Sequence, residues 1–211
     1  MRDSFGLIGL TFGELGFLLV VVGVFVMLPG VADPDIEIEP GPSPPPGVVE
    51  LEQEFGDLPN SGSFEVRTTF STLNITYTSA LLFVQCDWTL SSDGRDLLES
   101  HARVLWQHEE QITRLQIEGH ADSRPADGCA SLSELGELKP TNWLLSSLRA
   151  MRVREVLADL ALEHPEGNVD TRLRILEAVG RGDLHPIEQD NPAADVNRRL
   201  EITVHFRELS S

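Results

Sequence analysis

The chain has 211 residues, of which 34 are acidic and 16 basic, giving a formal net charge of -18. Such an excess of negative charge excludes a general nucleic-acid binder, because phosphate backbones repel it. Hydrophobic residues make up 41% of the chain, which is enough for a packed core and excludes disorder throughout.

The first element is an apolar segment, residues 7–28, whose only charged residue is Glu14. A helix of this length is roughly 33 Å long and can cross a hydrocarbon core of about 30 Å. A cleaved signal peptide is the alternative, since residues 30–32 resemble a cleavage site, but its apolar region is normally shorter and free of acidic residues. We therefore predict an uncleaved transmembrane helix within residues 1–32.

The flanking charges predict the orientation of this helix. Arg2 precedes it, and the next basic residue along the chain is Arg67. Because cytoplasmic flanks carry the excess of basic residues, we expect the N-terminus in the cytoplasm and the bulk of the chain on the extracytoplasmic side of the membrane.

Glu14 lies about two helical turns inside the apolar segment, where a carboxylate costs a few kcal/mol. Such groups usually face a protein partner or a water path, which makes Glu14 a candidate proton carrier. The alternative is that the membrane begins at Leu15, which places Glu14 at the interface but leaves a short span. Glycines recur beside Glu14 at three- or four-residue spacing and predict close packing against another helix.

Residues 33–63 have a different composition. Nine acidic residues and no basic residue occur between positions 33 and 65, and seven prolines occur between 34 and 59. Charge repulsion and proline stiffness extend a chain, and such a composition buries too little apolar surface to fold. We predict an acidic, proline-rich linker.

Residues 64–211 show the patterns of a folded domain. Serine or threonine residues precede two helical segments, and alternating apolar positions indicate strands. The order predicts an α/β fold, a two-layer sandwich of the type β/α/β/α/β-β with helices on one face of a mixed sheet. The predicted strands are 80–84, 114–120, 173–179 and 199–206, with an edge hairpin at 64–69 and 73–77, and the helices are 91–108 and 141–162.

Two charged residues stand out in this domain. Arg149 interrupts the apolar stripe of the second helix, and a guanidinium there needs an anionic partner or a ligand carboxylate. A structural salt bridge to Asp122 is one possibility. Asp122 follows a strand, where sites of α/β domains tend to form. An aspartate and an arginine facing one crevice would suit a zwitterionic ligand.

Four motifs in order resemble the OmpA-like C-terminal domain: IEGHAD at 117–122, NWLLSSLRA at 142–150, GRGDLHP at 180–186 and NRRLEI at 197–202. The resemblance implies non-covalent binding of peptidoglycan through the diaminopimelate of its stem peptide. It further implies that Asp122 pairs with the ligand ammonium and Arg149 grips its carboxylate. Asn142 would shape the pocket, and Arg198 is a further matching position that either contacts the ligand or braces the last strand.

The Asn142-Trp143 form of the second motif is most similar to the MotB branch, which includes subunits of Zorya-type anti-phage defence systems. In that branch a single N-terminal span carries one acid, here Glu14, and pairs with a MotA-like multi-span subunit in a proton-driven stator. The resemblance also implies a homodimer. This chain carries glutamate where the branch normally has aspartate.

A passive membrane-to-wall tether, in which Glu14 has no ion-conducting role, is the main alternative. An enzyme is not expected, because no nucleophile with a base and no glycine-rich phosphate loop occurs. The six histidines lack metal-ligand spacing, so neither a metal nor another cofactor is predicted, and His120 is interpreted as a structural residue at a strand end.

Cys86 and Cys129 are the only cysteines. Each is predicted to follow a strand at the same edge of the sheet, so the two could meet. In an oxidising compartment a disulfide between them would brace the loop beside the predicted pocket. Two unpaired thiols are the alternative.

Overall fold

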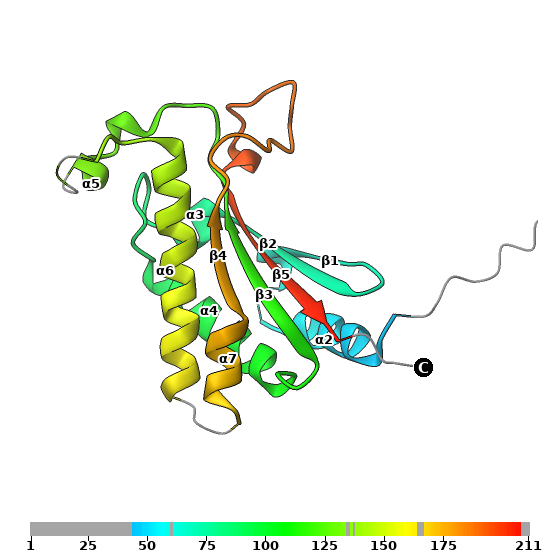
Figure 1. The fold of residues 1–211 in the computed structure, drawn as a ribbon. Coiled ribbons are helices and arrows are strands. Elements are labelled where there is room, and N and C mark those ends of the chain that lie inside the picture. The colour runs from blue at the N-terminus through cyan, green and yellow to red at the C-terminus, as the bar shows by residue number, and fades with distance from the viewer. Residues whose placement is uncertain (1–43, 60, 134–135, 137, 164–166, 208–211) are drawn as a thin grey trace, which may run out of the picture. The chain divides into compact units, whose positions relative to one another are not determined.

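The computed structural model describes residues 44–59, 61–133, 136, 138–163 and 167–207, which form a sheet with helices packed against it (Figure 1). The predicted transmembrane helix, Glu14 and the beginning of the predicted linker lie outside these residues. Within the described part of the chain, no helix has both the length and the apolar composition needed to cross a membrane.

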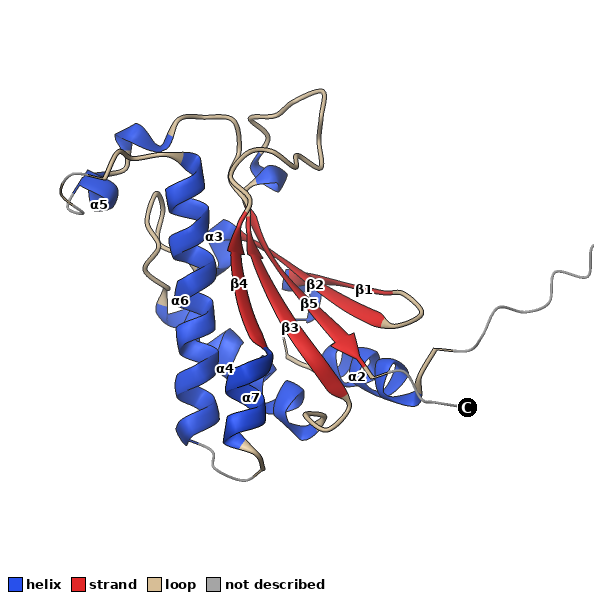
Figure 2. Ribbon diagram, in the orientation of Figure 1, coloured by secondary structure: helices blue, strands red, loops and turns tan. Residues whose placement is uncertain are grey.

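The sheet has five strands in the order β1-β2-β5-β3-β4 (Figure 2). β3 and β4 are parallel, and every other neighbouring pair is antiparallel. This confirms the predicted mixed sheet, including the last strand with its bounds. The bounds are Phe64–Thr68 (β1), Thr72–Thr78 (β2), Ile112–Gly119 (β3), Leu176–Gly180 (β4) and Arg199–Phe206 (β5).

The helices follow from capping and amphipathic patterns. Ser91 accepts a hydrogen bond from the Gly94 N–H at 2.9 Å, which caps the first long helix as predicted. At the second long helix, the Thr141 hydroxyl accepts from the Leu144 N–H at 3.1 Å. The helices are α2 (Pro46–Asp57), α3 (Ser79–Leu82), α4 (Ser92–Gln107), α5 (Ala130–Ser133), α6 (Asn142–Glu163) and α7 (Val169–Ile175), with 3-10 turns at Ser61–Ser63, Ala126–Gly128 and Asp195–Asn197.

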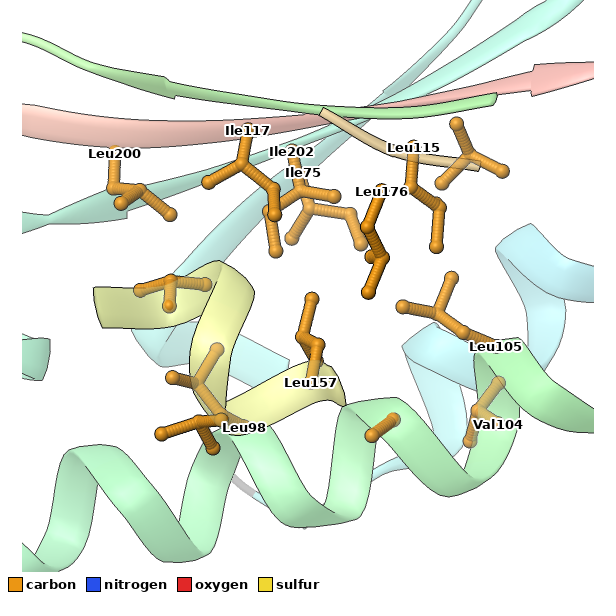
Figure 3. Close-up of a cluster of buried hydrophobic side chains, with 14 of the residues drawn as sticks. Ile75, Leu98, Val104, Leu105, Leu115, Ile117, Leu157, Leu176, Leu200 and Ile202 are labelled. Carbon is orange, nitrogen blue, oxygen red and sulfur yellow. The ribbon is translucent and has the colours of Figure 1, made fainter. Parts of the chain in front are cut away.

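The main core lies between the sheet and the two long helices. Alternation along β5 buries Leu200 and Ile202, while Glu201 lies on the opposite face of the sheet. Figure 3 shows Ile117 and Ile202 of the sheet directed toward Leu157 of α6. Burial of these side chains provides most of the apolar driving force for folding.

Part of the predicted linker belongs to this core. α2 begins at a pair of prolines, whose fixed φ suits a helix start. Its Val48, Leu51 and Phe55 are buried in the main core, and Phe55 contacts the rings of Phe64 and His101. The prediction of an extended linker is therefore wrong for Pro46–Asp57, because these three apolar residues share one helical face while the acidic residues lie elsewhere.

Three other predictions for the strands agree with the structure only in part or not at all. Residues 80–84 were expected as a strand, but Ser79–Leu82 is helical, because a short apolar run fits a buried helical turn equally well. The predicted edge hairpin is present as β1 and β2, although β2 also pairs with β5, so that of these two strands β1 alone lies at an edge of the sheet. The strand predicted from residue 173 begins at Leu176, since α7, capped by Asn168, occupies the preceding residues.

Candidate functional site

The described residues form a pocket of about 690 Å³ at the C-terminal end of β3. α3 and the turn after it form one wall, and the loop between β3 and α6 forms another. The N-terminal half of α6 and the 3-10 turn before β5 complete it. The charged and amide residues lining the pocket are Gln85, Asp122, Arg124, Asn142, Arg149, Asp195 and Arg198.

Close packing of α6 on the sheet sets the position of this pocket. A Cβ at Gly119 of β3 would collide with the Ser146 backbone, and one at Gly180 of β4 would collide with Ser147. Glycine is therefore required at both strand ends for the helix to approach. This approach places Arg149, one turn further along α6, over the pocket.

Arg149 is 5% exposed and lines the pocket. Its Nε donates to the Asp87 backbone carbonyl at 2.8 Å, and its Nη1 donates to the Ser79 hydroxyl at 3.2 Å. Its guanidinium also lies 5.1 Å from the centre of the Phe83 ring. All of these partners are neutral groups.

No carboxylate among the described residues forms an ion pair with Arg149, so the salt bridge to Asp122 considered from the sequence is not present there. Burial lowers the pKa of Arg149 to about 10, against the opposing effect of Asp87 and Asp122. The side chain therefore stays positively charged at neutral pH, with its charge uncompensated by a contacting anion. A buried cation of this kind suits a ligand carboxylate.

Asp122 is 4% exposed and forms the centre of an ion-pair network. Its carboxylate accepts from the Arg124 backbone N–H at 2.9 Å, from Arg124 Nε at 2.8 Å and from Arg198 Nη1 at 2.8 Å. Asp195 binds the same two arginines, at 3.0 Å and 2.7 Å. The network holds the Asp122 carboxylate in place at the pocket wall.

Asn142 is the first residue of α6, and its Nδ2 donates to the Asp122 backbone carbonyl at 2.9 Å. It thereby joins the start of α6 to the end of β3. The structure thus brings the four residues expected from the sequence, Asp122, Asn142, Arg149 and Arg198, into one pocket. Their binding roles stay predictions.

Sequence reasoning missed several members of the site. Arg124 lies two residues after Asp122 in a loop without a periodic pattern, so only its proximity to Asp122 could have indicated it. Asp195 reaches the network from a 3-10 turn 71 positions from Arg124. The Asp87 contribution is a backbone carbonyl, which no side-chain pattern reveals.

Cys86 and Cys129 form a disulfide with a Cα–Cα distance of 5.2 Å, and both line the pocket. Cys86 follows α3, so the prediction that it follows a strand is wrong. The bond joins the turn after α3 to the loop before α6, so it connects two pocket walls.

Glu118, His120 and Glu201 are the group in the described residues whose donor atoms lie close enough to hold a metal ion. Burial, together with the nearby Arg199, lowers the pKa of His120 to about 4, so the ring is neutral at pH 7. However, Glu118 already binds Arg181, and Glu201 binds Arg199 at 2.5 Å. Because guanidinium groups already compensate both carboxylates, we interpret the group as a structural ion-pair network.

The OmpA family model matches residues 82–199 of this chain. No curated protein sequence matches it. A MotB-like protein from Desulfovibrio vulgaris is similar in structure, with 20% identity, 77% of this chain and 91% of that chain covered, and a TM-score of 0.58.

Two further solved structures share the fold. The cell wall anchor of the T6SS from Pseudomonas aeruginosa has 24% identity, covers 74% of this chain and 97% of its own, and has a TM-score of 0.56. The periplasmic domain of Helicobacter pylori MotB has 18% identity, covers 69% of this chain and 83% of its own, and has a TM-score of 0.52. At these identities the likeness establishes the fold.

Proposed function

The chain belongs to the OmpA family, and from that premise we propose that its described domain binds peptidoglycan. In this proposal the pocket around Asp122 and Arg149 receives the diaminopimelate of the stem peptide, a residue that carries both an ammonium and a carboxylate. The domain would then lie in the periplasm, where the cell wall is accessible.

The observation that carries the proposal is the uncompensated charge of Arg149. Its contacts with the Asp87 carbonyl and the Ser79 hydroxyl orient the guanidinium but give its positive charge no ion-pair partner among the described residues. A carboxylate entering the pocket would supply the missing anion through charge-assisted hydrogen bonds. The same pocket contains Asp122 for a ligand ammonium, which matches a zwitterionic group.

The ammonium has to share Asp122 with two arginines. Arg198 is partly buried, whereas the side chain of Arg124 is 53% exposed and can move away at little cost. Arg124 would then remain near Asp195, with which it already forms an ion pair. Arg198 would keep the Asp122 carboxylate oriented while the ligand binds.

A pelleting assay with purified sacculi tests the proposal. For the full-length protein, we expect Arg149→Ala and Asp122→Ala each to lower the affinity by at least about tenfold, because each leaves one ligand charge unpaired in a desolvated pocket. Arg149→Lys keeps the charge but loses the planar donor set, so it should bind with intermediate affinity.

Arg152→Ala is the matched control, since Arg152 lies on the same helix but is partly exposed and pairs only with Glu155 among the described residues. It should bind sacculi like the wild type. Circular dichroism would show whether each variant is folded. Unchanged binding by folded Arg149→Ala and Asp122→Ala would reject this pocket as the peptidoglycan site.

We further propose that the protein is the wall-anchoring, MotB-like subunit of a proton-driven stator in the inner membrane. Glu14 would carry protons beside a MotA-like multi-span partner, and the chain would act as a homodimer. The support is the sequence of the 7–28 segment and the fold shared with MotB periplasmic domains. Flagellar-type rotation and Zorya-type defence are the two processes that this architecture would serve.

Glu14→Gln separates this role from that of a passive tether. The substitution removes the ionisable carboxyl group and keeps the shape of the side chain. A stator should therefore lose its proton-driven activity, while sacculi binding stays unchanged. Glu14→Asp, the matched control, retains a carboxylate and should retain part of the activity. Full activity of Glu14→Gln in cells would favour the tether, as would the absence of a neighbouring gene for a multi-span channel subunit.

A further inference from the structure

The turn between α3 and α4 supplies the nearer of the two hydrogen-bond acceptors found for Arg149 among the described residues. A bridge between Phe83 and Leu90 closes this turn, and the Asp87 N–H donates to the Val84 carbonyl at 3.1 Å. At its tip, the Asp87 carbonyl accepts from Arg149 Nε at 2.8 Å. The orientation of the guanidinium therefore depends on the backbone conformation at this tip.

Cys86, directly before Asp87, has a φ of 56° and is the only non-glycine residue with positive φ among those described. The backbone of a non-glycine residue is strained at positive φ, and the residue keeps this conformation only when surrounding contacts impose it. Two contacts do so here, both from the opposite wall of the pocket. They are the disulfide to Cys129 and a hydrogen bond of 3.1 Å from the Ser131 hydroxyl to the Cys86 carbonyl.

The opposite wall is itself held by few apolar contacts. Ala126, Cys129 and Leu132 form a small cluster with Leu145 of α6, separate from the main core. The disulfide is the one covalent tie between this cluster and the turn after α3. Without it, the hydrogen bond from Ser131 and the packing of Trp88 would have to hold the two walls together.

We propose that the Cys86–Cys129 disulfide is a positioning element for Arg149, and that carboxylate binding in the pocket depends on this bond. The inference rests on the proposed function, because it concerns the same pocket. When the bond opens, Cys86 relaxes from positive φ and the Asp87 carbonyl turns away from Arg149. The guanidinium then loses its oriented acceptor and no longer presents its free donors to the ligand.

The first test measures the affinity of the full-length protein for a soluble diaminopimelate-containing muropeptide, before and after treatment with a dithiol. The dithiol supplies two electrons and two protons, which convert the protein disulfide to two thiols while the reagent becomes a cyclic disulfide. We expect reduction to weaken binding about tenfold, a difference of about 1.4 kcal/mol. Equal affinity of the oxidised and reduced protein would overturn the proposal.

Two variants separate positioning from a general loss of stability. The double variant Cys86→Ser/Cys129→Ser should bind like the reduced protein and should not respond to the dithiol. In an Arg149→Lys background the disulfide has no guanidinium to orient, so reduction should change the affinity by less than about twofold. An equally large loss in that background would mean that the disulfide acts only on stability.

A second test needs no ligand. In protein labelled with ¹⁵N-arginine, the Arg149 Nε–H should give a resonance protected from exchange, identified by its loss in Arg149→Lys. We expect reduction to remove this protection, and unchanged protection would overturn the proposal. If the oxidised protein bound no muropeptide at all, the proposed function would fail, but this resonance would still decide whether the disulfide positions Arg149.

Discussion

The two ends of the domain are held by different kinds of contact. Around the sheet centre, side chains such as Leu98, Leu157 and Ile202 are completely buried in one continuous apolar core (Figure 3). At the pocket end the apolar cluster is small, and ion pairs and a disulfide provide the remaining contacts. Stability is therefore concentrated at one end of the domain, and the candidate binding groups at the other.

The buried polar groups of the two regions differ in the same way. In the main core, the Tyr77 hydroxyl and His101 Nδ1 are 2.5 Å apart, and burial keeps both groups neutral by raising the pKa of Tyr77 and lowering that of His101 to about 4. In the pocket, Arg149 stays positively charged at neutral pH. Tyr77 and His101 bond to each other as neutral groups, although His101 Nε2 has no hydrogen-bond partner among the described residues. By contrast, the charge of Arg149 has no contacting anion within the described part of the chain, which suits a binding site.

The largest expected effect concerns the core helix α2. Phe55→Ala should lower the free energy of unfolding by about 3–5 kcal/mol, since it removes a buried ring packed against Phe64 and His101. Val49→Ala is the matched control, because Val49 lies on the same helix but is exposed, and it should cost less than about 0.5 kcal/mol. Urea denaturation measures both.

Sacculi binding by the folded Phe55→Ala protein should stay at the wild-type level, since the substitution affects the end of the domain away from the pocket. If Phe55→Ala and Val49→Ala had equal free energies of unfolding, α2 would not belong to the core. The segment would then be better described as the linker that the sequence predicts.

A smaller effect is expected from acidification. The folded pKa of His101 is about 4, below the value of about 6.5 for an unfolded histidine, so between these values the unfolded state binds the proton more readily. The contribution of His101 is therefore fully present above pH 6.5 and is lost as the pH falls toward 4. It amounts to at most about 3 kcal/mol.

Urea denaturation between pH 4.5 and 7 measures this dependence. His101→Gln should be less stable than the wild type at pH 7 but should lose less stability on acidification. His205→Gln is the control, since His205 lies on the outer face of β5 and is partly exposed, and it should leave most of the slope in place. A wild-type slope in His101→Gln would show that His101 is not buried as a neutral group.

The main core could largely be predicted from the sequence, because its information is periodic. Alternation at Leu200, Ile202 and Val204 indicated β5 with its bounds, and the serine before α4 indicated the helix start. α2 was misassigned because its acidic and proline composition outweighed three correctly spaced apolar residues. Composition averages over a segment, whereas burial depends on a single face of the helix.

The pocket could be predicted only where a motif carried it. Asp122, Asn142, Arg149 and Arg198 lie in family motifs, and all four line the pocket. By contrast, the Asp87 carbonyl and the Asp195 carboxylate reach the site from irregular turns. Contacts of this kind join segments that are far apart in the sequence, so no local sequence pattern indicates them.

The smallest expected effect lies where the two regions meet, at the start of α6. This helix begins at the pocket and runs into the main core, so loosening its first turn should affect the pocket more than the fold. Thr141→Ala removes the hydroxyl that caps the Leu144 N–H and should lower the free energy of unfolding by about 1 kcal/mol. In hydrogen exchange, protection should fall for the first turn of α6 and stay unchanged around Leu157.

Thr141→Ser keeps a capping hydroxyl and should behave like the wild type, so a loss of protection in Thr141→Ser as large as in Thr141→Ala would show that the cap does not hold this end. A loss extending to Leu157 would instead show that the pocket end and the core unfold as one unit, and the division between them would fail.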